Sequence, residues 1–339
     1  MPSKALSIVS ALAAITPLNV LGQEASNAPR FILGEETIST LTSDSVTASD
    51  RFVDYSTAYT SSGIKVVHGE DGRMDTCEVG TGVLADYVNH VANNTVLITD
   101  ADKLSKDGDF YNLALRPYEI IGVEPCAGER FSDQKLGGDC TGFMISADVL
   151  VTAHHCLELF WHITDKAFVR NFEFDCNNSL TKSRFPKEDV VLGSEARILA
   201  SDSFRDFSIV KLPIPFGVDG GVSIYPKTDS ATGENVGIVG HPVGLPMKWA
   251  ASDEDLVIAE DDLNAFTNVD AFMANSGSPI FLQDTGTLFG ILIGGDKDWN
   301  HAIEDGNLCF KSATSVLEDG SEQVLKASAI HDILELAVQ

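Results

Sequence analysis

Short apolar runs separated by turn-forming residues dominate the chain from Tyr118 onward, and they restrict the fold more than any other feature. Gly, Pro, Asp or Asn stands between successive runs. Runs of this kind predict the strands of a β-sandwich or barrel, because βαβ units would alternate strands with longer helical segments. The runs occupy residues 119–123, 141–146, 168–174, 196–200, 207–212, 235–240, 278–282 and 288–294.

Two regions depart from this pattern. Near the C-terminus, apolar residues recur at the spacing of one helical face and predict a terminal helix. They are Val324, Leu325, Ile330, Ile333, Leu334 and Ala337. Between Gly80 and Thr99 the apolar residues predict a short helix followed by a strand. Gln23 to Ser62 is rich in Ser, Thr, Ala and Asp, a composition typical of poorly ordered segments.

The N-terminus has the pattern of a signal peptide, which we place at residues 1–22. Lys4 is followed by the apolar run Ala5 to Ile15, and small or apolar residues stand at Val20 to Gly22. The run is too short to span a bilayer, and no later segment reaches about 18 uninterrupted apolar residues. Six cysteines favour an oxidising compartment. Together these features predict a secreted, extracellular protein that does not associate with a membrane.

The charge of the chain argues against a role with nucleic acid. Acidic residues number 50 and basic residues 23 among 339, giving a formal net charge of −27. Such a surface repels phosphate backbones and anionic lipid, so we expect a well-solvated acidic exterior.

Three segments contain residues suited to nucleophilic catalysis. In the first, two apolar runs between Cys140 and Cys156 predict a hairpin that ends at His155, and a disulfide between these cysteines would clamp its end. In the second, Asp206 stands just before the predicted strand 208–212. In the third, Ser276 begins a Ser-Gly-Ser-Pro sequence ahead of an apolar run. Taken alone, each segment also has a structural interpretation, as a buried histidine or a turn.

Together the segments resemble those of trypsin-like serine proteases. Thr-Ala-Ala-His-Cys is typical of that family around its histidine, and here His154 takes the place of a small residue. The strand after Asp206 is similar to the family's Asp-x-x-Leu-Leu-Lys-Leu pattern. Asn275 to Phe281 resembles the Asn-Ser-Gly-Ser-Pro-Val-Phe segment of the glutamyl-endopeptidase branch. The order His, Asp, Ser is that of the chymotrypsin arrangement.

The resemblance covers about residues 120–339 and implies a fold and a division of the chain. The implied fold is all-β, with two six-stranded antiparallel β-barrels and a C-terminal helix. It places a serine protease domain at 118–339, after a leader or pro-segment at 23–117 that matches nothing we can name. Gly240 to Lys248 resembles a His-Pro-x-Gly-x-Pro loop of secreted bacterial-type relatives, for which we expect a structural role.

The resemblance also implies an activity, that of a secreted zymogen and serine endopeptidase acting on proteins or peptides as a monomer. Its catalytic triad would be His155, Asp206 and Ser276, and its oxyanion hole the backbone N–H groups of Ala274 and Ser276. Relatives usually have Gly at position 274, so we expect Ala274 to slow the enzyme. The alternative is a catalytically weak or inactive trypsin-fold protein with a binding or regulatory role. Neither interpretation needs a cofactor or a metal ion.

The side-chain specificity and most cysteine pairings stay open at this stage. The resemblance places Asp270, Leu292 and Gly294 at the substrate pocket. Asp270 either selects a cationic side chain or only makes hydrogen bonds behind the pocket. Leu292 stands where glutamate-specific relatives have His, so glutamate preference is not supported. A bond between Cys77 and Cys126 would tether the leader after cleavage, a hypothesis based on cysteine number alone.

Overall fold

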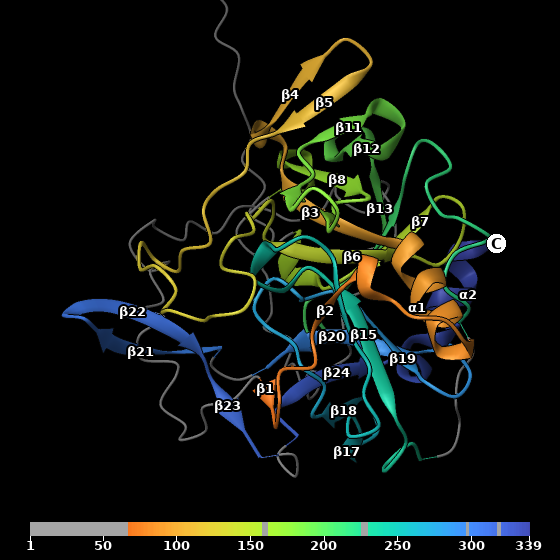
Figure 1. Ribbon diagram of the computed structural model, residues 1–339. Coiled ribbons are helices and arrows are strands. Elements are labelled where there is room, and N and C mark those ends of the chain that lie inside the picture. The colour runs from red at the N-terminus through yellow and green to blue at the C-terminus, as the bar shows by residue number, and fades with distance from the viewer. Residues whose placement is uncertain (1–66, 158–161, 225–229, 296–297, 317–319) are drawn as a thin grey trace, which may run out of the picture. The chain divides into compact units, whose positions relative to one another are not determined.

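Two curled antiparallel sheets make up most of the structure (Figure 1). The computed structural model describes residues 67–157, 162–224, 230–295, 298–316 and 320–339. All of them belong to one compact unit, Phe31–Gln339. The expected signal peptide at 1–22 and the leader as far as residue 66 lie outside the described residues.

The sheets contain seven and eight strands, where the sequence predicted six in each of two barrels. The first sheet consists, in order of pairing, of β12 (Val190–Leu192), β8 (Lys166–Arg170), β3 (Thr95–Asp100), β6 (Cys140–Met144), β7 (Val149–Thr152), β14 (Phe207–Lys211) and β13 (Arg197–Asp202). The second consists of β17 (Val257–Glu260), β18 (Asn264–Thr267), β24 (Glu322–Lys326), β20 (Leu288–Gly294), β19 (Pro279–Leu282), β15 (Val236–Gly240), β16 (Lys248–Ala250) and β2 (Met74–Asp75). The predicted all-β class, with two antiparallel sheets and a C-terminal helix, is confirmed.

Smaller ladders flank the two sheets. Their strands are β1 (Val67–His68) with β23 (Thr314–Ser315), β9 (Phe174–Asp175) with β10 (Leu180–Thr181), β21 (Trp299–Glu304) with β22 (Asn307–Ser312), and β4 (Leu104–Asp107), β5 (Phe110–Leu113) and β11 (Arg184–Pro186). Only β1 and β23 pair in parallel; the others are antiparallel.

A shared hydrophobic core joins the two sheets. Val151 of the first sheet and Phe281 and Ile291 of the second belong to one cluster, and all three are fully buried. Every residue of β6 and β7 is buried, so these strands are covered on both faces. This explains why neither strand alternates apolar with charged residues.

Part of the expected leader is built into both sheets. β3 lies between β6 and β8, and β2 forms the edge of the second sheet beyond β16. The predicted helix followed by a strand is present as α1 (Val83–Asn93) and β3. Structurally the fold therefore begins before residue 118, because the apolar residues of β3 are 0–1% exposed and complete the first sheet's core.

The C-terminal helix is shorter than the apolar spacing predicted. α2 (His331–Val338) follows a 3₁₀ turn at Ala327–Ile330 and contributes Leu334 to the shared core. Val324 and Leu325 belong instead to β24, since both faces of that strand are buried between its neighbours. Within the described residues, no helix has the length and apolar character needed to cross a bilayer.

Three disulfides are present, and they use all six cysteines. The bond between Cys140 and Cys156 is the one predicted. The hypothesis of a Cys77–Cys126 bond is wrong, because Cys77 is bonded to Cys176 and Cys126 to Cys309.

Candidate active site

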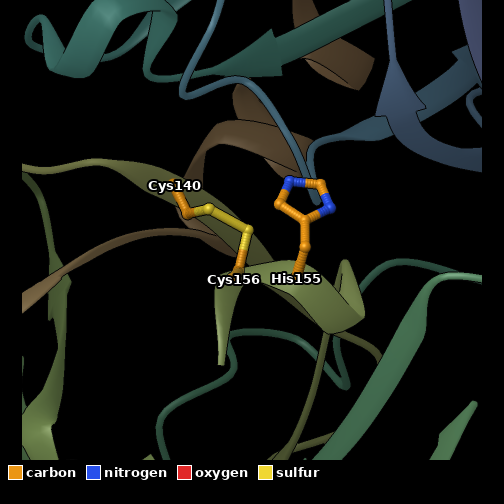
Figure 2. Close-up of side chains that lie close together, drawn as sticks. All are labelled: Cys140, His155 and Cys156. Carbon is orange, nitrogen blue, oxygen red and sulfur yellow. A yellow bond between two sulfur atoms is a disulfide. The ribbon is translucent and has the colours of Figure 1, made fainter. Parts of the chain in front are cut away.

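The hairpin of β6 and β7 positions His155. β7 ends at Thr152, and a 3₁₀ turn from His154 to Cys156 follows it. The disulfide from Cys156 to Cys140, at the start of β6, closes the hairpin beneath the turn, and the imidazole ring of His155 stands beside it (Figure 2). The turn is therefore fixed by a covalent bond as well as by the strand before it.

Asp206 holds His155 through both oxygens of its carboxylate. β14 pairs with β7 in a register that places Ser208 opposite Thr152, which brings the residue just before β14 next to the histidine turn. Oδ2 lies 2.7 Å from Nδ1 of His155, and Oδ1 accepts the backbone N–H of His155 at 2.9 Å. An ionised carboxylate only accepts hydrogen bonds, so this contact places the ring proton on Nδ1 and leaves Nε2 as the basic nitrogen.

A tight turn between β18 and β19 carries Ser276. The carbonyl of Ser276 accepts the backbone N–H of Thr141 at 2.9 Å, which ties the turn to β6 of the first sheet. Gly277 has φ +86°, and a Cβ there would lie 2.1 Å from the carbonyl oxygen of Thr141. The turn therefore requires glycine after the serine, for both its backbone angle and its close approach to β6.

One cleft of about 510 Å³ brings these groups together. His155, Asp206 and Ser276 all line it, and so do the predicted pocket residues Leu292 and Gly294. The side chains of His155 and Asp206 are 31% and 24% exposed, so water and a ligand reach them. The structure describes both Ser276 and His155, and it shows no hydrogen bond between their side chains.

The peptide between Met273 and Ala274 is held in one orientation. The carbonyl of Met273 accepts the N–H of Val243 at 2.5 Å, and the N–H of Met273 donates to Asp298 at 2.9 Å. In a trans peptide the C=O and the following N–H point in opposite directions, so the N–H of Ala274 points away from Val243. Ala274 itself has φ +69°, in the left-handed region that favours glycine.

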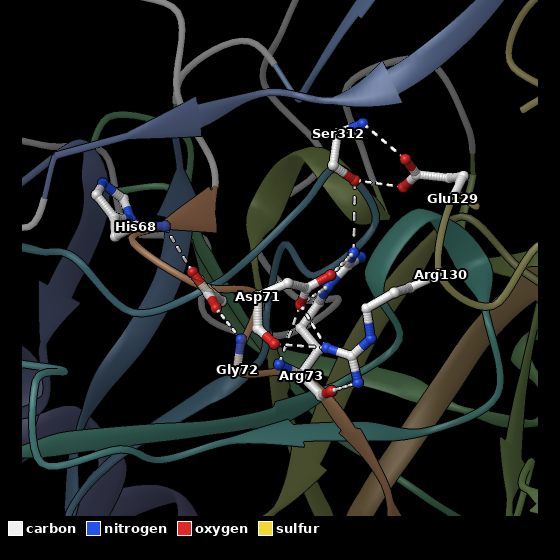
Figure 3. A network of polar contacts seen from close by, with 8 residues as sticks. His68, Asp71, Gly72, Arg73, Glu129, Arg130 and Ser312 are labelled. Carbon is white, nitrogen blue, oxygen red and sulfur yellow. Dashed lines mark hydrogen bonds and ion pairs between the residues drawn. The ribbon is translucent and has the colours of Figure 1, made fainter. Parts of the chain in front are cut away.

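Asp270 does not line the cleft, contrary to the expectation that it sits in the substrate pocket. It is 3% exposed, and its two carboxylate oxygens accept the backbone N–H groups of His68 at 2.8 Å and Gly72 at 2.6 Å (Figure 3). Burial raises the pKa of Asp270 to about 7, against the effect of these two hydrogen bonds. Asp270 thus anchors the segment that begins at Val67.

The segment that begins at Val67 also packs against one wall of the cleft. Arg73 is 1% exposed and pairs with Asp71 at 2.7 Å (Figure 3). Its guanidinium lies 3.8 Å from the ring centroid of Phe272. Phe272 is one of the residues that line the cleft. Residues that the sequence assigned to a leader therefore pack against the candidate site.

Neither of the histidine- or cysteine-containing clusters found among the described residues fits a metal ion. In one, Cys140, His155 and Cys156 offer ligand atoms within 4.8 Å of one another (Figure 2). The other combines Cys126 and Cys309 with Glu304. In both, the two sulfur atoms are bonded to each other, so no thiolate is present to bind a metal.

Two acidic residues of the cleft were not identified from the sequence. Asp298 and Glu322 both line it, although neither belongs to a segment with a recognisable motif. Glu322 reaches the cleft because β24 pairs with β20, the strand that ends in Gly294. Only that strand pairing places Glu322 at the cleft, and a single sequence does not show the pairing.

Comparisons with known proteins give a family match and two structural likenesses. Residues 140–291 match the family model of a trypsin-like peptidase domain. Among solved structures, a Glu endopeptidase in complex with MPD has a TM-score of 0.42 and 18% identity, over 81% of this chain and 100% of that chain. Rv3671c from M. tuberculosis, in an inactive mutant form, has a TM-score of 0.38 and 15% identity, over 76% of this chain and 91% of that chain. No curated protein matches the chain.

The two sheets, with a His–Asp pair on one and a serine turn on the other, define a trypsin-like serine protease fold. The matched peptidase region contains all three segments that the sequence singled out, around His155, Asp206 and Ser276.

Proposed function

We propose that this protein is a secreted serine endopeptidase in which Ser276 is the nucleophile, His155 the general base and Asp206 the group that orients the base. One observation carries the proposal: Asp206 bonds Nδ1 of His155 at 2.7 Å inside the cleft that Ser276 also lines. This arrangement leaves Nε2 as the acceptor for a proton in the cleft.

The proposed reaction passes through an acyl-enzyme. Oγ of Ser276 attacks the peptide carbonyl while Nε2 of His155 accepts the hydroxyl proton, and the tetrahedral intermediate forms with a negative oxygen. The C–N bond then breaks and His155 returns the proton to the leaving amine. Water repeats the sequence to release the acid. The hydroxyl must come within hydrogen-bond reach of Nε2, an approach that catalytic pairs commonly complete when substrate binds.

We assign the oxyanion hole to the backbone N–H groups of Ala274 and Ser276. The bond from Val243 to the carbonyl of Met273 supports this assignment, because that carbonyl is occupied elsewhere and the N–H of Ala274 points to the opposite side. Loss of one such donor reduces catalysis by about 10²–10³.

A catalytically weak binding or regulatory protein is the second candidate. Ala274 in place of glycine favours it, together with the lack of a recorded hydrogen bond between the described side chains of His155 and Ser276. The two candidates differ in one measurable property, the reactivity of the Ser276 hydroxyl.

Labelling with a fluorophosphonate probe tests the proposal. The protein recovered from the medium of secreting cells should be labelled and should degrade casein, and the Ser276→Ala variant should do neither. Absence of labelling after the leader has been removed, with a folded protein and intact disulfides, would support the binding role instead.

Secretion and processing also belong to the proposal. The three disulfides support an extracellular location for a protein that acts as a monomer on protein or peptide substrates, with a signal peptide at 1–22. Because β2 and β3 are parts of the two sheets, we place any activating cut upstream of Val67 and not near Pro117. N-terminal sequencing of the secreted form tests this placement.

A further inference from the structure

The backbone just before the proposed nucleophile needs support from outside its own segment. Ala274 has φ +69°, an angle that is unfavourable for a residue with a Cβ. The side chain of Met273 is 57% exposed, so packing does little to hold the residue in front of it. A backbone in an unfavourable conformation persists only where surrounding contacts fix it. Hydrogen bonds to Met273 and Ala274 must therefore do much of this work.

Three hydrogen bonds hold the backbone of these two residues. The C=O of Met273 accepts the N–H of Val243, and the C=O of Ala274 accepts the hydroxyl of Thr141 at 3.0 Å. The N–H of Met273 donates to Oδ2 of Asp298 at 2.9 Å. For the fourth polar group, the N–H of Ala274, the structure records no acceptor among the residues that it describes. That N–H is thus the group left to bind the negative oxygen of the intermediate.

Asp298 differs from the other two partners because it makes its contact through a charged side chain. Its own backbone is also held in place. The C=O of Asp298 accepts the N–H of Ala313 at 2.9 Å, and the C=O of Ala313 accepts the N–H of Val67 at 3.1 Å. The carboxylate therefore extends from a backbone that is tied to the β1–β23 ladder.

The contact does not require a fixed charge on Asp298. Burial raises its pKa to about 7, against the hydrogen bond from Met273 and the positive charge of Arg73. Near neutral pH the group is therefore present in both protonation states. An oxygen that accepts an N–H remains in either state. The segment before Ser276 thus depends on where this oxygen lies more than on its charge.

We propose that Asp298 is a positioning residue for the oxyanion hole: by accepting the N–H of Met273, it fixes the peptide that presents the N–H of Ala274 to the negative oxygen. This inference deepens the proposed function and rests on it. We expect the effect mainly on the transition state and not on substrate binding, because the substrate oxygen becomes fully charged only as the reaction proceeds.

Two substitutions of similar shape test the inference. Asp298→Asn keeps an oxygen acceptor, and Asp298→Leu replaces both oxygens with methyl groups, while both remove the charge. The substrate is a quenched fluorescent peptide built on a casein bond that the wild type cuts. Asp298→Asn should keep kcat within about five-fold of the wild type. Asp298→Leu should lower kcat by about 10- to 100-fold and change KM by less than about three-fold, since complete loss of one oxyanion donor costs about 10²–10³.

A transition-state mimic separates positioning from the general shape of the cleft. A trifluoromethyl ketone with the acyl-side sequence of the same peptide forms a hemiketal with Ser276, and its negative oxygen needs the oxyanion hole. Its inhibition constant should be at least about ten-fold higher in Asp298→Leu than in Asp298→Asn. Binding of the uncleaved peptide to the Ser276→Ala protein should change by less than about three-fold when Asp298→Leu is added.

Asp261→Leu is the matched control. Asp261 is exposed, and its carboxylate accepts the N–H of Leu263 at 2.8 Å in a turn that does not line the cleft. This variant should keep kcat, KM and the inhibition constant within about two-fold of the wild type. If Asp298→Leu does not fold, Asp298→Ala takes its place, because it also removes the acceptor.

Equal kcat values in Asp298→Asn and Asp298→Leu would overturn the inference. An equal loss of ketone inhibition and of binding of the uncleaved peptide would also overturn it, because Asp298 would then shape the cleft as a whole. In both cases a wild type labelled by fluorophosphonate would keep the proposed function. A wild type that is not labelled after leader removal would refute the proposed function, and this inference with it.

Discussion

At the scale of single residues, Asp206 combines two tasks in one carboxylate. One oxygen fixes the backbone of His155 and the other fixes its ring, so the position and the tautomer of the base depend on the same side chain. Asp206 has φ +58°, a left-handed angle that Asp tolerates better than most residues. A substitution of Asp206 can therefore change the tautomer of His155 without moving the backbone of His155.

Asp206→Asn is expected to reduce kcat by about 10⁴ and to leave the fold intact. The amide oxygen would keep the bond to the backbone N–H, while the amide N–H₂ would donate to Nδ1 and move the ring proton to Nε2, which removes the base. Steady-state kinetics on a peptide substrate measure the loss, and urea unfolding serves as the control. A loss of less than ten-fold would show that Asp206 does not set the tautomer.

Ala274→Gly is expected to stabilise the protein by about 1 kcal/mol or less and to change kcat by only a few-fold. The substitution relieves a left-handed angle that disfavours a Cβ, but glycine also gains entropy in the unfolded chain. Because the peptide before Ala274 is already held by Val243, we expect no large gain in rate. A rise of 100-fold in kcat would mean that this peptide is turned away from the substrate in the wild type.

The candidate catalytic residues were predictable from sequence, whereas the pocket was not. His155, Asp206 and Ser276 each sit in a short local motif, and their order along the chain adds a third constraint. Asp270 was placed in the pocket by its distance from Ser276 alone, but its carboxylate is bound by a segment about 200 residues upstream. Contacts between segments so far apart leave no local pattern.

At the scale of elements, β3 is a central strand of its sheet although its local sequence pattern is weak. The sequence predicted a strand near residues 96–98, and it is present. Its place between β6 and β8 was not predicted, since the pairing partners follow it by more than 40 residues. The β4–β5 hairpin was not predicted, although Gly108-Asp109 between two strands is a recognised hairpin sequence.

Leu97→Ala in the full chain is expected to lower the free energy of unfolding by about 2–5 kcal/mol, because Leu97 is fully buried in β3. Leu180→Ala is the matched control, since Leu180 is 63% exposed and should change the stability by less than about 0.5 kcal/mol. Urea unfolding measures both. If both variants changed stability equally little, residues 67–117 would behave as a leader that the folded domain does not need.

At the scale of the whole molecule, acidic residues fall into two groups, one with raised and one with lowered pKa values. The two groups make stability depend on pH in opposite directions. Burial raises the pKa of Asp255 to about 6 and those of Asp270 and Asp298 to about 7. The pKa of Glu260 is lowered to about 2: burial opposes the shift, and hydrogen bonds from Ser230 and Ala231 together with Lys326 outweigh it. Asp71 and Asp100 also have lowered pKa values, because their arginine and lysine partners outweigh the effect of burial.

These shifts predict that stability is greatest near pH 4–5, to within about a unit. Acids with raised pKa bind more protons in the folded state, so their contribution is present below the unfolded pKa of about 4 and is lost as pH rises to about 7. Acids with lowered pKa contribute above about pH 4, and their contribution is lost as pH falls toward about 2. Urea midpoints measured across this range should rise and then fall.

Asp255→Asn is the variant that isolates one group, because it removes a carboxyl whose pKa is about 6. The decline in the urea midpoint between about pH 4 and 6 should become shallower than in the wild type. A midpoint that climbs steadily from pH 4 to 8 in the unmodified protein would contradict the assignment of these three acids.

The Cys77–Cys176 bond has a consequence for a chain that is cut. It joins the start of the described N-terminal segment to the loop between β9 and β10, and β3, β6 and β7 lie between these two cysteines along the chain. A nick anywhere inside that span would produce two polypeptides that migrate as one band until a reducing agent is added. Gels run under both conditions would therefore distinguish a nicked molecule from an intact one.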